Sequence, residues 1–265
     1  SLIMKKLIKT LLRQFPDIKY MEETMQALFV PPGHYYSPIV NPKEINERNI
    51  IWSYENRING INLNLTKQEQ LLQEFELFYS NLPFKKNKID DLRYYYNNDM
   101  YSYSDGIFLF SMLRFFNPSK IIEVGSGYST GLMLDTNNKF LNNTMEINCI
   151  EPYPARLKSV IKDSDNINIF ESKVQDIEIS FFEQLNEGDI LFIDSTHVSK
   201  TASDVNHIVF NIFPYLKPGV IIHIHDIFFP FEYPRDWVLE QNRSWNEAYL
   251  IRAFLTNNND YEIIA

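Results

Sequence analysis

Acidic side chains stand where apolar segments of the sequence end. Glu123, Glu151 and Asp194 each follow a run of apolar residues, and Asp176 lies shortly after another. The carboxyl ends of parallel strands share one edge of a sheet, and open α/β sheets bind ligands at that edge. We therefore expect these four carboxylates to line one crevice.

Histidines lie close to two acids that end apolar segments, Asp194 and Asp226. His197 follows Asp194 by three residues, and His225 directly precedes Asp226. An imidazole next to a carboxylate can hold or accept a proton near neutral pH. We expect Asp194, His197, His225 and Asp226 to form a reaction centre, and His223 to be a buried packing residue.

A glycine turn follows the first acid. Gly125 and Gly127 begin a dinucleotide-like pattern, but its third position holds Thr130, and Gly131 comes one residue late. A carboxylate at Glu123 would repel a pyrophosphate and would suit a cationic amine. The turn therefore favours a cofactor that carries an amino acid, such as S-adenosylmethionine.

These residues require a scaffold in which strands and helices alternate. The apolar runs predict strands at 121–124, 146–151, 167–171, 189–194 and 220–225, with a sixth at 261–264. The intervening patterns predict helices at 128–139, 154–162, 180–185, 201–215 and 245–255. Such alternation is typical of an α/β fold with a doubly wound, mostly parallel sheet.

Residues 1–104 lack this alternation and are predicted to form a mainly helical extension or lid. Helices are expected at 20–29 and at 66–79, where Thr66 and Glu69 resemble a capping box. Another helix is expected at 105–116. The tyrosines between 94 and 103 fit either a seam against the main domain or a wall of the substrate pocket.

Five stretches in order resemble the class I S-adenosylmethionine-dependent methyltransferases. They are Ile121–Gly127, Cys149–Pro152, Val174–Ile177, Asp189–His197 and Leu216–Asp226. The resemblance implies a Rossmann-like methyltransferase domain over residues 105–265, with the last antiparallel strand of that fold missing after 261–264. The segments 190–204 and 223–234, with the loop 32–39, are similar to a bacterial subgroup with His-Asp after strand five.

The resemblance also implies roles for individual residues. Glu123, Gly125 and Gly127 would contact the methionine part of the cofactor, and Glu151 would hold the ribose. Asp176, with Val174 and Gln175, would flank the adenine. Asp194 would face both the cofactor and the acceptor.

A divalent metal is one of two alternatives for the reaction centre. Related catechol-type enzymes hold magnesium through acids after strands four and five, which here are Asp194 and Asp226. Ile227 cannot ligate, so His225, His197 or water would complete the shell. In the metal-free alternative, His197 or His225 is the general base, held by Asp226 or Asp194.

Composition limits the classes of partner that the protein is expected to bind. A net charge of −9 argues against non-specific nucleic-acid binding, which needs cationic side chains. The charges interleaved in 1–15 predict an amphipathic helix, docked on its own domain or on a second subunit, and not a membrane span. The single cysteine, Cys149, is expected to be a core thiol and fits a cytoplasmic location.

The sequence favours O-methylation of a small-molecule or sugar-like hydroxyl. A non-catalytic nucleotide-binding or assembly protein on the same fold, and an NAD-dependent oxidoreductase, remain alternatives. A Ser/His/Asp hydrolase built on Ser195 is disfavoured because no Gly-x-Ser-x-Gly elbow surrounds that serine.

Overall fold

The computed structural model describes residues 16–48, 52 and 58–265. The chain divides into two compact units, Ser1–Tyr54 with Tyr233–Ser244, and Glu55–Glu232 with Trp245–Ala265. The second unit contains the sheet and begins well before the boundary at 104 expected from the sequence. The amphipathic helix expected at 1–15 lies outside the described residues.

The described part of the first unit contains three short helices. They are α2 (Pro16–Gln26), α3 (Pro42–Glu47) and α10 (Arg235–Leu239). Asn41 caps α3 by accepting a hydrogen bond from the Lys43 N–H at 3.1 Å. Trp52 Nε1 donates to the Tyr233 carbonyl at 3.0 Å, and the Arg235 guanidinium lies over the Trp52 ring. These contacts tie the two chain segments of the unit together, and neither α3 nor α10 was predicted from the sequence.

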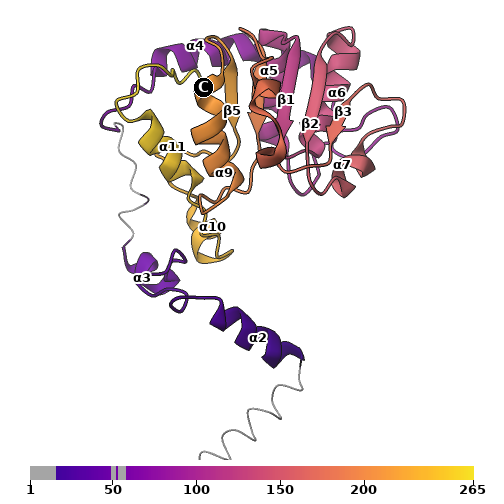
Figure 1. Ribbon diagram of the computed structural model, residues 1–265. Coiled ribbons are helices and arrows are strands. Elements are labelled where there is room, and N and C mark those ends of the chain that lie inside the picture. The colour runs from indigo at the N-terminus through magenta and orange to yellow at the C-terminus, as the bar shows by residue number, and fades with distance from the viewer. Residues whose placement is uncertain (1–15, 49–51, 53–57) are drawn as a thin grey trace, which may run out of the picture. The chain divides into compact units, whose positions relative to one another are not determined.

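The second unit is built on a five-stranded, fully parallel sheet in the order β3-β2-β1-β4-β5. Its strands are β1 (Lys120–Val124), β2 (Glu146–Ile150), β3 (Asn168–Phe170), β4 (Ile190–Ile193) and β5 (Ile221–Ile224). Figure 1 shows the strands flanked by helices. The predicted doubly wound α/β sheet is confirmed, with each strand within a residue or two of its expected bounds.

Side-chain alternation along the strands divides the core between the two faces of the sheet. In β4, Ile190 and Phe192 pack into one apolar cluster, while Leu191 and Ile193 pack into the other. All four side chains are buried, because helices cover both faces of this central strand. Each fully buried aliphatic side chain contributes about 1.5–3 kcal/mol to folding.

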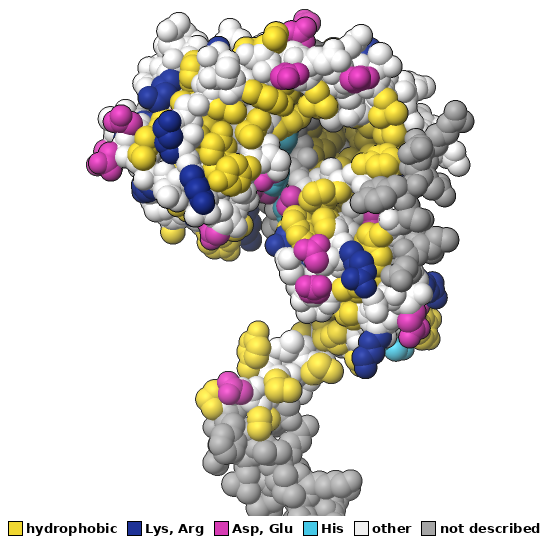
Figure 2. Space-filling view, turned by 180° about the vertical axis from the view of Figure 1, so that it is seen from behind, with side chains coloured by type: hydrophobic (Ala, Val, Ile, Leu, Met, Phe, Trp, Pro, Cys, Tyr) yellow, Lys and Arg dark blue, Asp and Glu magenta, His cyan; other side chains and the backbone are white. Residues whose placement is uncertain are grey.

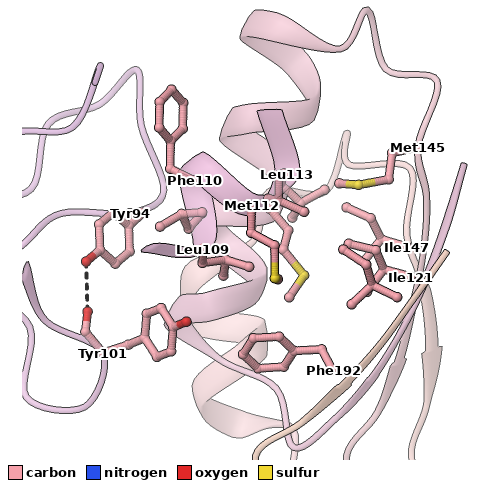
Figure 3. Close-up of a cluster of buried hydrophobic side chains, with 14 of the residues drawn as sticks. Tyr94, Tyr101, Leu109, Phe110, Met112, Leu113, Ile121, Met145, Ile147 and Phe192 are labelled. Atoms are coloured by element: carbon pink, nitrogen blue, oxygen red, sulfur yellow. Dashed lines mark hydrogen bonds between the residues drawn. The ribbon is translucent and has the colours of Figure 1, made fainter. Parts of the chain in front are cut away.

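The first face is covered by α4 (Leu65–Glu76), α5 (Tyr103–Phe116), α6 (Tyr128–Phe140) and α7 (Ala155–Val160). In Figure 3, Leu109, Met112 and Leu113 of α5 lie toward the strand residues Ile121 and Ile147. Tyr94 and Tyr101 belong to the same cluster, and the Tyr94 hydroxyl donates to the Tyr101 carbonyl at 2.9 Å. These two buried tyrosines therefore pack within the domain that carries the sheet.

The second face is covered by α8 (Ile179–Phe182), α11 (Glu247–Leu255) and the turns that follow α9 (Asp204–His207). The chain continues from α9 through a wider π turn, Ile208–Ile212, and a tighter turn, Phe213–Tyr215. Ser203 starts α9 by accepting from the Asn206 N–H at 3.1 Å, so the helix begins later than the predicted residue 201. Within the described ranges, no helix has the length and apolar character needed to cross a membrane.

Two local predictions are wrong. Residues 261–264 form no strand: the Tyr261 hydroxyl donates to the Phe213 carbonyl, and the Ile263 carbonyl accepts from the Asn64 side chain. The tail is thus held by side chains and not by a strand ladder. Helix α4 begins at Leu65 without a capping box at Thr66, and the Asn64 side chain before it is turned to the tail.

Candidate active site

The glycine turn lies between β1 and α6, against the end of β4. Gly125 has a φ of +81°, and its N–H donates to the Ile150 carbonyl at 3.0 Å. A Cβ at this position would lie 2.0 Å from the Asp194 carbonyl oxygen, so only glycine fits. The Gly127 N–H is bonded to the Thr130 hydroxyl at 3.1 Å. The turn keeps backbone close to the crevice, as a nucleotide-derived cofactor requires.

Glu123 lies beneath this turn and is fully buried. The Ser129 hydroxyl donates to its carboxylate at 2.6 Å, and the Thr130 hydroxyl and Cys149 thiol also bond to it. Burial raises the pKa of Glu123 to about 7, against the lowering effect of these hydrogen bonds. Glu123 thus ties β1 to the start of α6, and its contact with the cofactor amine stays a prediction. Cys149 is buried, as a core thiol should be.

Glu151, at the end of β2, faces the tip of the glycine turn. Its two oxygens accept from the Ser126 N–H at 3.1 Å and the Tyr153 N–H at 2.7 Å. A carboxylate has about four acceptor positions, so capacity remains for two ribose hydroxyls.

The predicted adenine-flanking residues lie at the 3₁₀ turn Val174–Asp176. Asp176 is exposed and Val174 is buried in the core. The Gln175 side chain donates to the Ala202 carbonyl at 2.9 Å. Their contact with an adenine stays a prediction.

The acids and histidine after β4 and β5 meet around one imidazole. His197 Nε2 lies 3.3 Å from Asp194 Oδ1 and 3.8 Å from Asp226 Oδ2. Its other nitrogen, Nδ1, lies 2.8 Å from Glu247 Oε2, which comes from the start of α11. The His197 ring is 5% exposed and is covered by Trp245 at 4.2 Å. Three carboxylates from three elements therefore surround a single buried imidazole.

Two residues of this cluster have a strained backbone. His197 and Asp226 have φ values of 59° and 60°, in the left-handed region that costs about 1–3 kcal/mol for such residues. The His197 carbonyl accepts from the N–H groups of Asn246 and Glu247, at 3.1 and 3.2 Å. These bonds hold His197 in its strained conformation, and strain maintained in this way is characteristic of functional sites.

The charges of this cluster favour a protonated His197. Burial lowers the pKa of His197, but hydrogen bonds and charge interactions with Asp194 and Glu247 outweigh it and raise the pKa to about 9. Burial raises the pKa of Asp226, against the lowering effect of His225 and His197. At neutral pH His197 thus carries a positive charge, and a group that already holds its proton is poorly suited to serve as the base.

The two histidines of the β5 end differ in surroundings. His225 Nε2 lies 3.6 Å from Asp226 Oδ1, and the Tyr101 ring packs 5.1 Å from the imidazole. His223 stacks on Phe192 at 4.4 Å, and burial lowers its pKa to about 3. His223 is therefore neutral and acts in packing, whereas the place of His225 in a reaction centre stays a prediction.

Asp194 and Asp226 were expected from the sequence to be metal ligands, but the described residues give this expectation no support. Within residues 16–48, 52 and 58–265, no group of three or more His, Cys, Asp or Glu side chains is arranged to hold a metal ion. Asp194 and Asp226 both lie within 4 Å of His197 Nε2, so a cationic nitrogen lies near both carboxylates. The carboxylates are oxygen ligands of the kind that magnesium prefers, whereas the imidazole nitrogen suits a softer ion.

An apolar groove of about 740 Å³ runs along the free edge of β5 and reaches Asp226. Figure 2 shows apolar side chains around a hollow that contains histidine and acidic side chains. Asp105, His225 and Asp226 are among the polar residues that line it. His225 and Asp226 therefore border a space large enough for a small molecule.

Two residues of the site were not predicted from the sequence. Glu247 lies fifty positions after His197, and nothing in the sequence pairs them. Its only signal is an acid in the first turn of an otherwise apolar helix. Asp204 accepts from the Thr196 N–H at 2.9 Å and the Thr196 hydroxyl at 2.6 Å, which fixes the loop before His197.

Comparison with known proteins gives the family. A model of the methyltransferase domain matches residues 122–227, from β1 to the residue after Asp226. An uncharacterized protein of the archaeon Archaeoglobus fulgidus is 34% identical over 178 residues, which cover 65% of this chain and 80% of the relative. The bacterial origin expected from the sequence thus stays a prediction.

Among solved structures, the S-adenosylhomocysteine-bound methyltransferase PaMTH1 of Podospora anserina is 16% identical, with a TM-score of 0.44 over 88% of this chain and 91% of that one. So loose a likeness carries no weight in the assignment. From the domain match and the archaeal relative, together with the parallel sheet, the chain belongs to the class I S-adenosylmethionine-dependent methyltransferases.

Proposed function

We propose that this methyltransferase acts on a hydroxyl group of a small-molecule or sugar-like acceptor, with Asp194, His197, His225 and Asp226 at the reaction centre. The observation that carries the proposal is the convergence of these side chains at the ends of β4 and β5, where His225 and Asp226 also line the β5 groove. A hydroxyl acceptor must lose a proton, and this cluster contains groups able to take it.

Bound here, S-adenosylmethionine would supply a methyl group on a sulfonium, and the proton of the acceptor hydroxyl would pass to this cluster. The proposed cradle for such a cofactor is the turn at Gly125, where only glycine fits against the Asp194 carbonyl. Gly127 and Glu151 complete the proposed binding surface. Glu123 supports the turn from below, and Asp176 is the proposed adenine neighbour.

Asp226 is the proposed general base. Burial raises the pKa of Asp226 above its ordinary value, which makes its carboxylate a stronger base. His225 lies beside it and can share the accepted proton. Asp194, which directly follows β4, pairs with His197 Nε2 through its Oδ1 atom.

Two measurements on the full chain test this proposal. Calorimetry should detect S-adenosylhomocysteine binding, and labelled methyl transfer should occur to hydroxyl acceptors and not to amines. Asp226→Asn should reduce the transfer rate by about 10²–10⁴-fold and leave cofactor affinity within about twofold. The exposed acid Asp163 provides the control, since Asp163→Asn should change neither quantity. An unchanged rate in Asp226→Asn would exclude Asp226 as the base.

A further inference from the structure

We propose that the groove along β5 binds the apolar body of the acceptor, so that the acceptor is an alcohol or phenol with an elongated alkyl or aryl body and its hydroxyl lies beside Asp226. The inference rests on the proposed function, because it names the acceptor class of the same site. It selects an apolar acceptor over a sugar-like one. All the residues that line the groove belong to the unit that carries the sheet.

One face of α5 forms a wall along the length of the groove. The residues of this face recur every three or four positions, as one side of a helix does: Asp105, Phe108, Met112 and Phe116. The helix ends at Phe116, shortly before β1 begins at Lys120, so Phe116 lies at the edge of the sheet where the parallel strands begin. Asp105 lies at the opposite edge, and the wall between them is about 16 Å long.

The end of the groove beside Asp105 is polar. His225 and Asp226 directly follow β5 and line the groove at this end. The ring of Phe108, one turn after Asp105, lies 6.1 Å from the ring of His223, which shows that α5 runs alongside β5 in the opposite direction. An acceptor hydroxyl therefore finds hydrogen-bonding groups at this end of the groove, where the proposed base lies.

Beyond this end the lining is mainly apolar, with aromatic rings from α5 and from the loop after β5. Gln68 and Glu262 are polar, but Gln68 donates to the Leu63 carbonyl, and Glu262 accepts from the Asn64 side chain at 3.2 Å. A sugar ring bound here would bury hydroxyls among apolar side chains, which is unfavourable. An alkyl or aryl body would instead remove apolar surface from water on both sides of the contact.

The floor of the groove is the free edge of the sheet. Because β5 is the last strand and pairs only with β4, the backbone groups of Ile222 and Ile224 face the groove. So short an edge discourages the addition of a peptide strand. The volume of about 740 Å³ is instead typical of a site for a small molecule, and backbone groups are common among the few polar contacts of such sites.

Binding of 4-alkylphenols to the full chain tests the proposal by calorimetry. From 4-ethylphenol to 4-butylphenol, the affinity should rise about fourfold for each added methylene, as expected for a chain that is buried in an apolar groove. Methyl glucoside should show no measurable binding. An affinity that is equal across the series, or tighter binding of methyl glucoside, would overturn the proposal.

A variant at the far end of the groove tests where the alkyl chain lies. Ile264 lines the groove in the tail, and the nearby Tyr261 hydroxyl donates to the Phe213 carbonyl shortly before β5 begins. Ile264→Asp should lower the affinity of 4-octylphenol about tenfold or more and leave that of 4-ethylphenol within about twofold, because only the longer chain reaches the new charge. Ile89→Asp is the matched control: Ile89 is exposed outside the groove, so neither affinity should change. Unchanged 4-octylphenol binding in Ile264→Asp would contradict the proposal.

Labelled methyl transfer separates this inference from the proposed function. Along the alkylphenol series, KM should fall while kcat stays within about threefold, because the chain makes the same contacts in the ground state and the transition state. If hydroxyls are methylated with a KM that does not depend on chain length, the proposed function stands and the inference is wrong. If binding depends on chain length but no hydroxyl is methylated, the proposed function fails, whereas the groove is still a site for apolar bodies.

Discussion

Gly125 and Asp194 touch so closely that a Cβ on the glycine would lie 2.0 Å from the aspartate carbonyl oxygen. We predict that Gly125→Ala destabilises the chain by about 3–5 kcal/mol, because it adds a backbone clash to an unfavourable positive φ. The backbone displacement caused by this clash should also abolish S-adenosylhomocysteine binding. Urea unfolding and calorimetry measure the two effects.

Gly188 provides the control for the φ effect alone. Its φ is +84°, but a Cβ there would meet nothing within 4 Å. Gly188→Ala should therefore cost only about 1–2 kcal/mol and leave cofactor binding intact. Equal losses in the two variants would show that the contact with Asp194 is unimportant.

Glu151 is predicted to contribute to cofactor affinity through charge and acceptor capacity. Glu151→Gln should keep one oxygen acceptor but replace the other with a donor that opposes the Ser126 or Tyr153 N–H group. S-adenosylhomocysteine affinity should fall by about tenfold or more. Glu171→Gln, at an exposed acid after the neighbouring strand, should leave affinity unchanged by calorimetry. Equal affinity in both variants would remove Glu151 from the binding surface.

The sequence predicted the sheet well because buried parallel strands have a strong local signal. Apolar runs end in acids or in a glycine turn, and each such end proved to be the end of a strand. Asp194, His197, His225 and Asp226 could be placed together for the same reason, since strand ends converge on one edge.

The remaining features depend on contacts that local patterns do not encode. Glu247 joins the site only because α11 packs beside the loop after β4. The alternation at 261–264 indicated a strand, but side-chain bonds from Tyr261 and Asn64 hold that tail instead. Similarly, nothing in the sequence of 233–244 shows that it packs with Trp52.

Stability should fall as pH rises from neutral toward 9. The pKa of His197 is raised from 6.5 to about 9 on folding, so its contribution is complete below pH 6.5 and is lost as pH rises through 9. The loss is on the order of 3 kcal/mol at most. Urea unfolding between pH 7.5 and 9 measures it, and His197→Asn should flatten the dependence over that interval.

The titration of Glu123 must be separated from that of His197 in this measurement. Its pKa is raised from 4.5 to about 7, so its contribution is largest below pH 4.5 and is lost as pH rises to 7. Starting the series at pH 7.5 excludes most of that loss. A wild-type curve with no slope above pH 7.5 would contradict a protonated His197.

Arg93 should be important for the stability of the sheet domain. Its guanidinium bonds Asp135 Oδ1 at 2.7 Å and Asp165 Oδ2 at 2.7 Å, and Asp135 is 1% exposed. Arg93→Ala would leave the Asp135 charge buried without its partner, at a cost of about 3–5 kcal/mol in urea unfolding. The half-exposed pair of Lys158 and Glu171 provides the control. Because water screens that pair, Lys158→Ala should cost less than about 1 kcal/mol, and similar losses in both variants would mean that burial does not set the strength of the Arg93 pair.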